Sequence, residues 1–404
     1  MQDKPLPRRR YSAEVSYAGA HGQPPHLGAP FVRRVHNVGA PLGVLIALGT
    51  VAGLIVIGLT ALNPAGTAVG FVLSSIAMAI VVLAYLWLDR WEPEPPRLLV
   101  FAFIWGASAA VVIASVLQIF VEAWLNPGAP SAESTEISAV TLLIGAPFTE
   151  EAAKGLFLLL MMTGVRRNEL NSLTDCLVYA GLVGAGFAWL EDILYIADGE
   201  SLANSLVTAA LRLIMSPFAH SLFTTLFAVG VWFALHRRSG LAKAGCILLG
   251  YVGAVMLHAM WNGSALLGVQ AYFGLYVFWM FPIFGLAIAL AVHSRRREQR
   301  VVEAKLPGMV AAGVVTPNEA TWLKSIPMRK LAVAEARRFG GKQAADAVAR
   351  FARQVIELAF VRDRIDRGFG DQRVAVLLHE ETYGVYAARS ASPALAHMAG
   401  FRTP

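Results

Sequence analysis

The sequence of 404 residues has few charged side chains and almost no cysteine. Charged residues make up 15% of the chain, against roughly 25% in an ordinary soluble domain. Hydrophobic residues make up 56%, and the mean hydropathy is +0.56. The two cysteines, Cys176 and Cys246, provide neither a disulfide framework nor a metal-binding signature. This composition excludes disordered, collagen-like and disulfide-rich proteins, and it predicts a polytopic membrane protein.

Long apolar runs dominate the middle of the chain, and each is close to the roughly 20 residues that a helix needs to cross a bilayer. The eight runs lie at residues 40–62, 67–88, 98–125, 138–163, 172–197, 204–235, 241–267 and 271–293. The predicted fold is therefore all-α, a polytopic bundle of about eight transmembrane helices followed by a small helical C-terminal domain. We divide the chain into a flexible basic N-terminal tail (1–38), a transmembrane domain (39–293) and a basic helical C-terminal tail (294–404).

Lysine and arginine occur in alternate connecting segments. They occur in the N-terminal tail, in the second, fourth and sixth loops and after the last span, whereas the remaining loops have none. The positive-inside rule then predicts that both termini are cytoplasmic. The basic tail suits an anionic membrane surface, and because it carries no DNA- or RNA-binding signature, nucleic acid is not expected as a partner.

The C-terminal tail has helical periodicity with recognisable starts and stops. Pro317 is expected to open a helix that ends at Gly340-Gly341, and a second helix is expected from about Lys342 to Arg367. A third helix is expected over about residues 371–389. Basic faces on such helices are usually only solvated, and docking on a membrane surface or a regulatory role is the alternative.

The fourth apolar run contains three charged residues within five positions. Lys154 follows Glu150 by four residues and Glu151 by three, so on a helix it reaches either carboxylate. Two adjacent carboxylates that share one cation do not both ionise easily, so one of them is expected to take part in proton transfer. The alternative is a structural group of charges that neutralise one another.

The fifth and sixth runs also carry ionisable residues, which are expensive at membrane depth and normally face a protein interior. Glu191 and Asp192 point about 100° apart on a helix, so only one of them is expected to face a given site. Pro217 is expected to bend the sixth helix just before His220, and Pro147 is expected to do the same just before the glutamate pair. Arg212 is expected to snorkel or to pair with an acid. Structural roles remain the alternative for each residue.

The seventh run places His258 and Asn262 four residues apart on one helix face, where an interhelical hydrogen-bonding pair is the alternative to a functional role. The polar residues of these four consecutive spans are expected to share a pocket between mid-membrane and the outer face. Two imidazoles and a carboxylate can hold zinc. Without a metal, a glutamate can take a proton from water while Asn262 donates to the developing oxyanion. Both schemes predict amide hydrolysis within the membrane.

At these positions the sequence resembles the PrsW family of intramembrane proteases, which belongs to a larger group with the CAAX prenyl endoproteases and bacteriocin-processing proteins. The resemblance covers about residues 67–293. Its motifs are Asp89–Pro95, Glu150-Glu151 with Lys154, Phe187 with Glu191, His220, and His258 with Asn262.

The resemblance implies an intramembrane endopeptidase of the bacterial plasma membrane, with membrane-anchored protein substrates and the lipid bilayer as partners. Some members of the family cut anti-sigma factors. The implied catalytic residues are Glu150, Glu151, Lys154, Glu191 and Asn262. His220 and His258, with Glu191, are either ligands of a divalent metal such as zinc or groups that orient water. The prenyl endoproteases have histidine where Glu191 stands, which argues against prenyl-protein processing.

Two other functions are compatible with the same polar residues. A proton-coupled transporter or channel also uses carboxylates and broken helices at mid-membrane, although no second, related half is found in this chain. A non-catalytic scaffold would use the basic tail to recruit a partner. Asp89–Pro95 is expected to be a structural elbow whose charges lie among the lipid headgroups.

Overall fold

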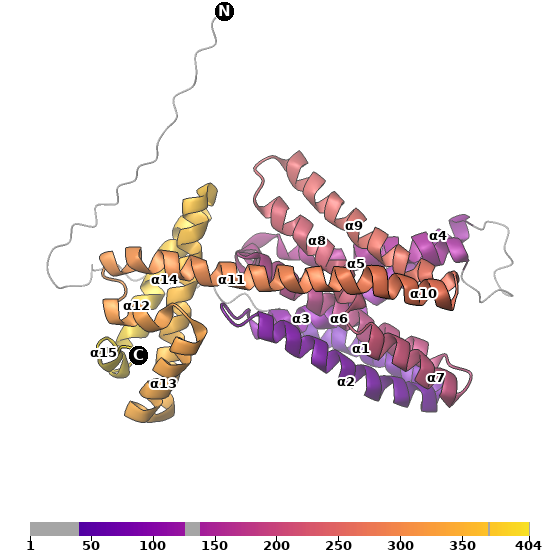
Figure 1. Ribbon diagram of the computed structural model, residues 1–404, viewed down its shortest axis with the longest axis horizontal. Coiled ribbons are helices and arrows are strands. Elements are labelled where there is room, and N and C mark those ends of the chain that lie inside the picture. Colours follow the sequence, from indigo (N-terminus) through magenta and orange to yellow (C-terminus); the bar gives the residue numbers. More distant parts are fainter. Residues whose placement is uncertain (1–39, 126–137, 371, 404) are drawn as a thin grey trace, which may run out of the picture.

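The described residues of the computed structural model, 40–125, 138–370 and 372–403, form helices and no strands (Figure 1). The tail predicted at 1–38 lies outside them. Seven helical segments among these residues are long and apolar enough to cross a membrane. They are α1 (Leu42–Leu62), α2 (Pro64–Leu88), α3–η1–α4 (Pro96–Trp105, Gly106–Ala110, Val111–Leu125), α6 (Leu173–Ala197), α7–η4–α8 (Leu202–Ala209, Ala210–Met215, Ala219–Leu235), α9 (Gly240–Leu266) and α10–η5–α11 (Val269–Leu275, Tyr276–Met280, Phe281–Ala311). The multi-pass, all-α architecture is confirmed.

The remaining expected span, residues 138–163, is also helical but is not one of the seven. It consists of a π-helical turn, η2 (Thr141–Gly145), followed by α5 (Ala146–Met161), and the 3-10 turn η3 (Gly164–Glu169) leads on to α6. Its three charged residues make it more polar than those seven segments. Because α5 packs against α4, α6, α8 and α9, these charges face protein rather than lipid.

The two prolines predicted to bend helices have different effects. Residues 216–218 are not helical and separate η4 from α8, so the break just before His220 is confirmed. At Pro147 the helix is not interrupted, because the wide turn η2 is followed directly by α5, and the bend expected there stays a prediction. The N–H of Ala146, the residue before the proline, still donates to the carbonyl oxygen of Thr141, so the helical hydrogen bonding continues up to Pro147.

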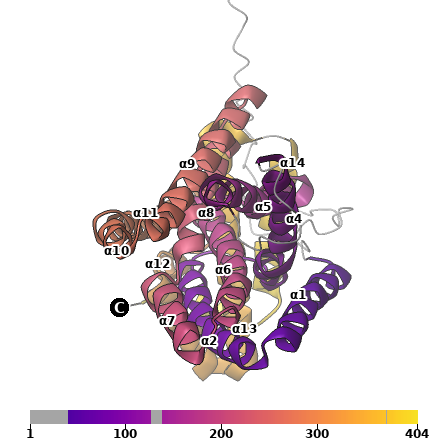
Figure 2. The ribbon, with the colours of Figure 1, turned by 90° about the vertical axis from the view of Figure 1, so that its right-hand side faces the viewer.

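Helix α6 forms the centre of the bundle, and nearly all of its residues are buried (Figure 2). Small residues let neighbouring helices approach it closely. A Cβ atom added at Gly186 would lie 1.9 Å from the carbonyl oxygen of Phe103, and one added at Gly184 would lie 2.7 Å from the Cα of Ser221. These contacts bring α3 and α8 against the two sides of α6.

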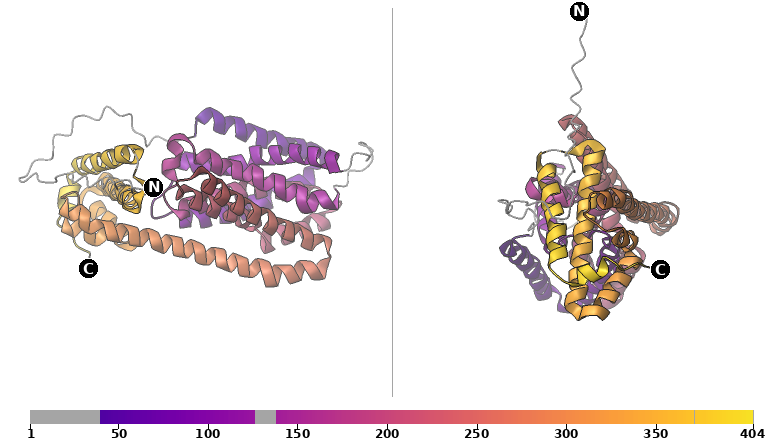
Figure 3. Two further views of the ribbon diagram at one scale, coloured as in Figure 1. Left: turned by 90° about the horizontal axis from the view of Figure 1, so that it is seen from above. Right: turned by 90° about the vertical axis from the view of Figure 1, so that its left-hand side faces the viewer.

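The last membrane helix does not end at residue 293. Helix α11 continues to Ala311 along one edge of the bundle and enters the C-terminal domain (Figure 3). Its outer part contributes Val302, Leu306 and Met309 to the core of that domain. The other elements of the domain are α12 (Pro317–Leu323), α13 (Ile326–Arg364), η6 (Ile365–Phe369), α14 (Gln372–Ser390) and α15 (Ala394–Met398).

Local signals explain most of the boundaries in the C-terminal domain. Thr316 and Glu319 form a capping box at the start of α12. The helix expected from Pro317 to Gly340 is divided, because the hydroxyl of Ser325 accepts a hydrogen bond from the N–H of Met328 and caps a new helix. Gly340 and Gly341 are not helical and kink α13 rather than ending it.

The segment between α2 and α3, Asp89–Pro95, joins the two parts of the molecule. Trp91 is 4% exposed and lies in the core of the C-terminal domain. Glu94 is buried and accepts a hydrogen bond from the hydroxyl of Tyr179 at 2.6 Å, while a carboxylate oxygen of Asp89 accepts one from the N–H of Glu94 at 2.9 Å. The expectation that the charges of this segment lie among headgroups was therefore wrong for Asp89 and Glu94, because protein donors surround them.

Candidate functional site

A cavity of about 700 Å³ lies within the helix bundle and extends toward the ends of α1 and α6. Five of the predicted site residues line it, and they come from α5, α6, α8 and α9. They are Glu150, Glu191, His220, His258 and Asn262. The pocket that was expected from four consecutive spans is thus present, and these five side chains share it.

Two predicted catalytic residues, Glu151 and Lys154, lie behind the cavity wall and are fully buried. The Nζ atom of Lys154 lies 2.8 Å from Oε1 of Glu151, 3.4 Å from Oε2 of Glu150 and 2.8 Å from Nδ1 of His220. It also lies 3.9 Å from the centre of the Phe187 ring, a cation–π contact. Lys154 therefore connects both glutamates to a histidine on another helix.

The contact with Lys154 determines the tautomer of His220. An ammonium group can only donate hydrogen bonds, so Nδ1 of His220 accepts from Lys154. The ring proton is then on Nε2, which lies 2.7 Å from Oε2 of Glu191 and donates to it. His220 thus links the buried ammonium to a carboxylate in the cavity.

His258 has the opposite tautomer. Its Nδ1 lies 3.1 Å from Oε1 of Glu151 and donates to this carboxylate, so the lone pair of Nε2 is free. Nε2 lies 3.9 Å from Oε2 of Glu150, and the imidazole stacks on Phe223 at a centroid distance of 4.6 Å. The inner carboxylate therefore orients His258, and the free nitrogen faces the carboxylate in the cavity.

Arg212 completes the other side of the cavity. Its Nε donates to Oδ1 of Asp192 at 2.5 Å, and its Nη2 donates to Glu191 in a short hydrogen bond. The expectation that Arg212 pairs with an acid is confirmed. Glu191 lines the cavity and Asp192 does not, so only one of the two adjacent acids faces the site, as their angular separation predicts.

Uncharged partners of the site were missed at the sequence level. Gln118 on α4 donates to Oε1 of Glu150 at 3.3 Å, and Thr224 lies within hydrogen-bonding distance of Glu151 at 3.2 Å. An amide in a largely apolar span was the available signal for Gln118. The amide of Asn262 donates to the backbone oxygen of Leu142 at 3.0 Å, which leaves its second N–H for the cavity.

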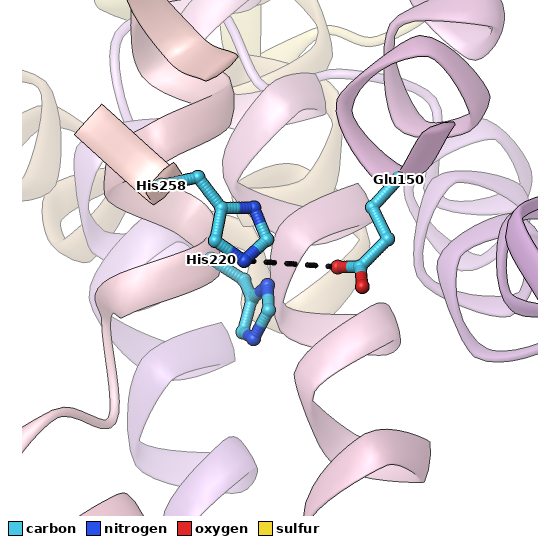
Figure 4. Close-up of side chains that lie close together, drawn as sticks. All are labelled: Glu150, His220 and His258. Atoms are coloured by element: carbon cyan, nitrogen blue, oxygen red, sulfur yellow. Dashed lines mark ion pairs between the residues drawn. The ribbon is translucent and has the colours of Figure 1, made fainter. Parts of the chain in front are cut away.

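Three of these residues have the donor set of a metal site. Among the described residues, Glu150, His220 and His258 each offer one ligand atom, and the three atoms lie within 4.8 Å of one another. Figure 4 shows the carboxylate of Glu150 directed at the two imidazoles, with the contact to His258 as a dashed line. Two imidazoles and one carboxylate, with a fourth position open, form a common zinc ligand set in hydrolases.

The surroundings of the histidines test whether a metal fits. The hydrogen bond from His258 to Glu151 has the usual outer-shell arrangement of a ligating histidine. His220 fits by residue type and distance, but its Nε2 carries a proton toward Glu191. Ligation through this atom requires the proton to leave and Lys154 to turn away from Nδ1. With that rearrangement, the residues fit a divalent metal.

Comparison with known proteins supports a hydrolytic function for this site. Residues 94–287 match the family described as PrsW family intramembrane metalloprotease. The match covers a little under half of the chain and contains every candidate site residue. It confirms the resemblance to a PrsW-type protease domain.

Two relatives, both named Protease PrsW, show the same similarity. The protein from Geobacillus kaustophilus is 27% identical over 154 residues, which are 38% of this chain and 61% of that protein. The protein from Oceanobacillus iheyensis is 25% identical over 191 residues, which are 47% of this chain and 80% of that protein. No solved structure matches the chain.

Proposed function

We propose that the protein is an intramembrane endopeptidase that hydrolyses peptide bonds of membrane-anchored proteins in the bacterial plasma membrane. The convergence of Glu150, His220 and His258 on a cavity inside a helix bundle carries this proposal. Ionisable groups inside a membrane protein cost free energy, so a cavity rich in them indicates a functional site. The match to a protease family supports hydrolysis over transport.

The two glutamates take different parts. Glu150 lines the cavity and can reach water, so it is the group that takes a proton from the attacking water in a metal-free scheme. Glu151 is enclosed by Lys154, His258 and Thr224 and does not line the cavity. Glu151 and Lys154 are therefore positioning residues, which hold His258 and His220 in orientation.

In the metal-dependent scheme, Glu150, His220 and His258 are the ligands. A zinc ion there would supply a Lewis acid that polarises the peptide carbonyl and activates water. Glu191 then remains as a cavity-lining carboxylate close to Nε2 of His220, and it takes the proton from the attacking water. Asn262 has an N–H to offer to the developing oxyanion in both schemes.

Several features of the biological role belong to the same proposal. Both termini lie in the cytoplasm, as the distribution of Lys and Arg indicates. The substrate is a single-span protein, and regulated cleavage of an anti-sigma factor is the process in which such a protease acts. The order of the glutamate and histidine motifs supports kinship with the CAAX prenyl endoproteases.

Cleavage of a single-span anti-sigma factor reporter by purified protein in vesicles tests the proposal. We expect Glu150→Gln to lower the cleavage rate at least about 100-fold, since a general base contributes roughly 10²–10⁴-fold. His220→Ala should abolish cleavage. Asp346→Asn, at an exposed position in the C-terminal domain, is the matched control and should cleave normally. Cleavage at the wild-type rate by well-expressed Glu150→Gln would refute the assignment.

Metal content separates the two schemes. In the metal-dependent scheme, purified wild-type protein holds about one zinc ion per chain, and His258→Ala loses it because one of three ligands is removed. Elemental analysis measures the zinc content directly. A chelator should also inhibit cleavage, and added zinc should restore it. Chelator-resistant cleavage by metal-free protein would favour the scheme in which Glu150 alone activates water.

A further inference from the structure

A second cavity, of about 290 Å³, lies where the segment between α2 and α3 meets helix α13 of the C-terminal domain. Four cationic side chains line it: Arg90, Arg329, Lys330 and Arg353. The lining contains no acidic residue. All four cations lie outside residues 94–287, the part that matches the protease family. The cavity is therefore separate from the proposed active site in both position and chemistry.

Arg329 is the most enclosed of the four cations, and its hydrogen-bonding capacity is largely unused. Its Nη1 donates to the backbone oxygen of Trp91 at 3.4 Å, and its guanidinium lies 4.5 Å from the centre of the Trp91 ring. Its Nε and Nη2 are buried and have no partner among the described residues. Burial lowers the pKa of the guanidinium to about 10. An enclosed cation with two free donors is costly unless an anion joins it.

The other three cations are exposed, and none forms an ion pair with a described residue. The acids of the adjoining segment are engaged elsewhere. Glu92 accepts a hydrogen bond from Asn171 at 2.8 Å, and Glu94 accepts one from Tyr179. Burial raises the pKa of both carboxyls well above the usual range. The segment thus holds its acids against the membrane domain and leaves the cavity positive.

The cavity also lies close to the level of the lipid headgroups. Trp87, in the last turn of α2, is half exposed, and the guanidinium of Arg295 lies 4.0 Å from its ring centre. An exposed tryptophan beside a cation at the end of an apolar helix is typical of the membrane interface. Arg90 follows Trp87 by three residues, so it reaches the headgroup region.

We propose that this cavity binds the phosphate group of an anionic ligand, and that an anionic lipid headgroup is the source that its position favours. Guanidinium groups match phosphate oxygens in geometry and donate paired hydrogen bonds to them. Arg329 provides the enclosed donors, and Arg90, Lys330 and Arg353 surround the entrance. A lipid bound there contacts the loop of the membrane domain and α13 together, and so fastens the C-terminal domain to the bilayer.

Native mass spectrometry of the full chain released from nanodiscs tests this site. The discs contain equal amounts of phosphatidylglycerol and phosphatidylcholine. We expect selective retention of phosphatidylglycerol by the wild type, and roughly fivefold weaker binding for each cation removed. The exposed double variant Lys330→Gln/Arg353→Gln should lose the retained lipid without a folding defect. Lys342→Gln/Arg373→Gln removes two exposed cations of the same domain outside the cavity and should retain it.

A second arm identifies the source of the phosphate. Inorganic phosphate is titrated into lipid-free protein in detergent, and its effect on the melting temperature is measured. Lipid retention that depends on Lys330 and Arg353 supports a headgroup ligand. A melting-temperature increase from phosphate alone that depends on the same residues supports a soluble phosphate ligand. If the cavity variant, the control variant and the wild type behave alike in both arms, the proposal is overturned.

Discussion

Removing the buried ammonium group of Lys154 should damage both stability and activity. The substitution Lys154→Met keeps an unbranched side chain that is one atom shorter, and it deletes the contacts with Glu151, Glu150 and His220. Glu151 then remains fully buried with only His258 and Thr224 as partners. The change therefore leaves an uncompensated carboxylate in the interior of the bundle.

The size of the effect follows from the enclosure of this pair. Removing one partner of a buried ion pair costs about 3–5 kcal/mol, and Lys154 and Glu151 are both inaccessible to solvent. A loss of this size lowers the melting temperature by on the order of 10 °C. Thermal unfolding in detergent, followed by tryptophan fluorescence, measures it. Reporter cleavage should fall as well, because His220 loses the donor to its Nδ1.

A double variant distinguishes this explanation from a simple packing defect. In Lys154→Met/Glu151→Gln neither unpaired charge remains, and replacing both members of a buried pair is often close to neutral. We therefore expect the double variant to regain most of the lost stability while cleavage stays low. If Lys154→Met melts like the wild type, or if the double variant is no more stable than the single one, the reasoning is wrong.

Two further predictions concern the bundle and its end. Gly186→Ala should lower the melting temperature by several degrees, because its Cβ would lie 1.9 Å from a backbone oxygen of α3 and must separate two helices; Gly285→Ala, where a Cβ meets nothing within 4 Å, should not. Burial raises the pKa of Asp89 to about 8, so the folded protein holds a proton that the unfolded chain releases above about pH 4. Stability should therefore fall as the pH rises from about 4 to about 8, and thermal unfolding of Asp89→Asn should show a smaller decrease. An unchanged pH profile in that variant would contradict the assignment of the proton.

Much of the site followed from helical geometry alone. The spacing of Lys154 and Glu150 by four residues predicted their contact, and the angle between Glu191 and Asp192 predicted that only one of them would line the cavity. These are relations within one helix, where rise and rotation per residue are fixed. They hold irrespective of how the helices pack.

Contacts between helices were less accessible from the sequence. Arg212 lies in the π turn η4, which carries an additional residue per turn and changes the direction of the side chains that follow. No local pattern predicts that turn. The sequence therefore could not decide whether Arg212 snorkels to solvent or pairs with an acid. The π turn before Pro147 was missed for the same reason, and only a bend at the proline was expected there.

The C-terminal domain shows the same division between local and long-range information. Pro317 predicted the start of α12, whereas the cap at Ser325 was missed and Gly340-Gly341 kink a helix that they were expected to end. The burial of Trp91 in its core joins residues more than 200 positions apart, and nothing near Trp91 in the sequence signals it. Glu94 was expected among the headgroups because its partner Tyr179 lies 85 residues further along the chain.

The burial of Trp91 determines how shortened versions of the chain must be designed. A chain cut after residue 293 loses the part of α11 that supports the C-terminal domain, and it leaves a large indole ring bare on the membrane part. Such a fragment would aggregate through this newly exposed apolar surface, and the resulting loss of activity could be mistaken for the effect of removing a regulatory domain. A truncated chain that also has Trp91→Ser separates aggregation from the loss of a regulatory domain. This substitution removes only the ring outside the bundle, and Leu98 of α3 stays packed in the core of the membrane domain.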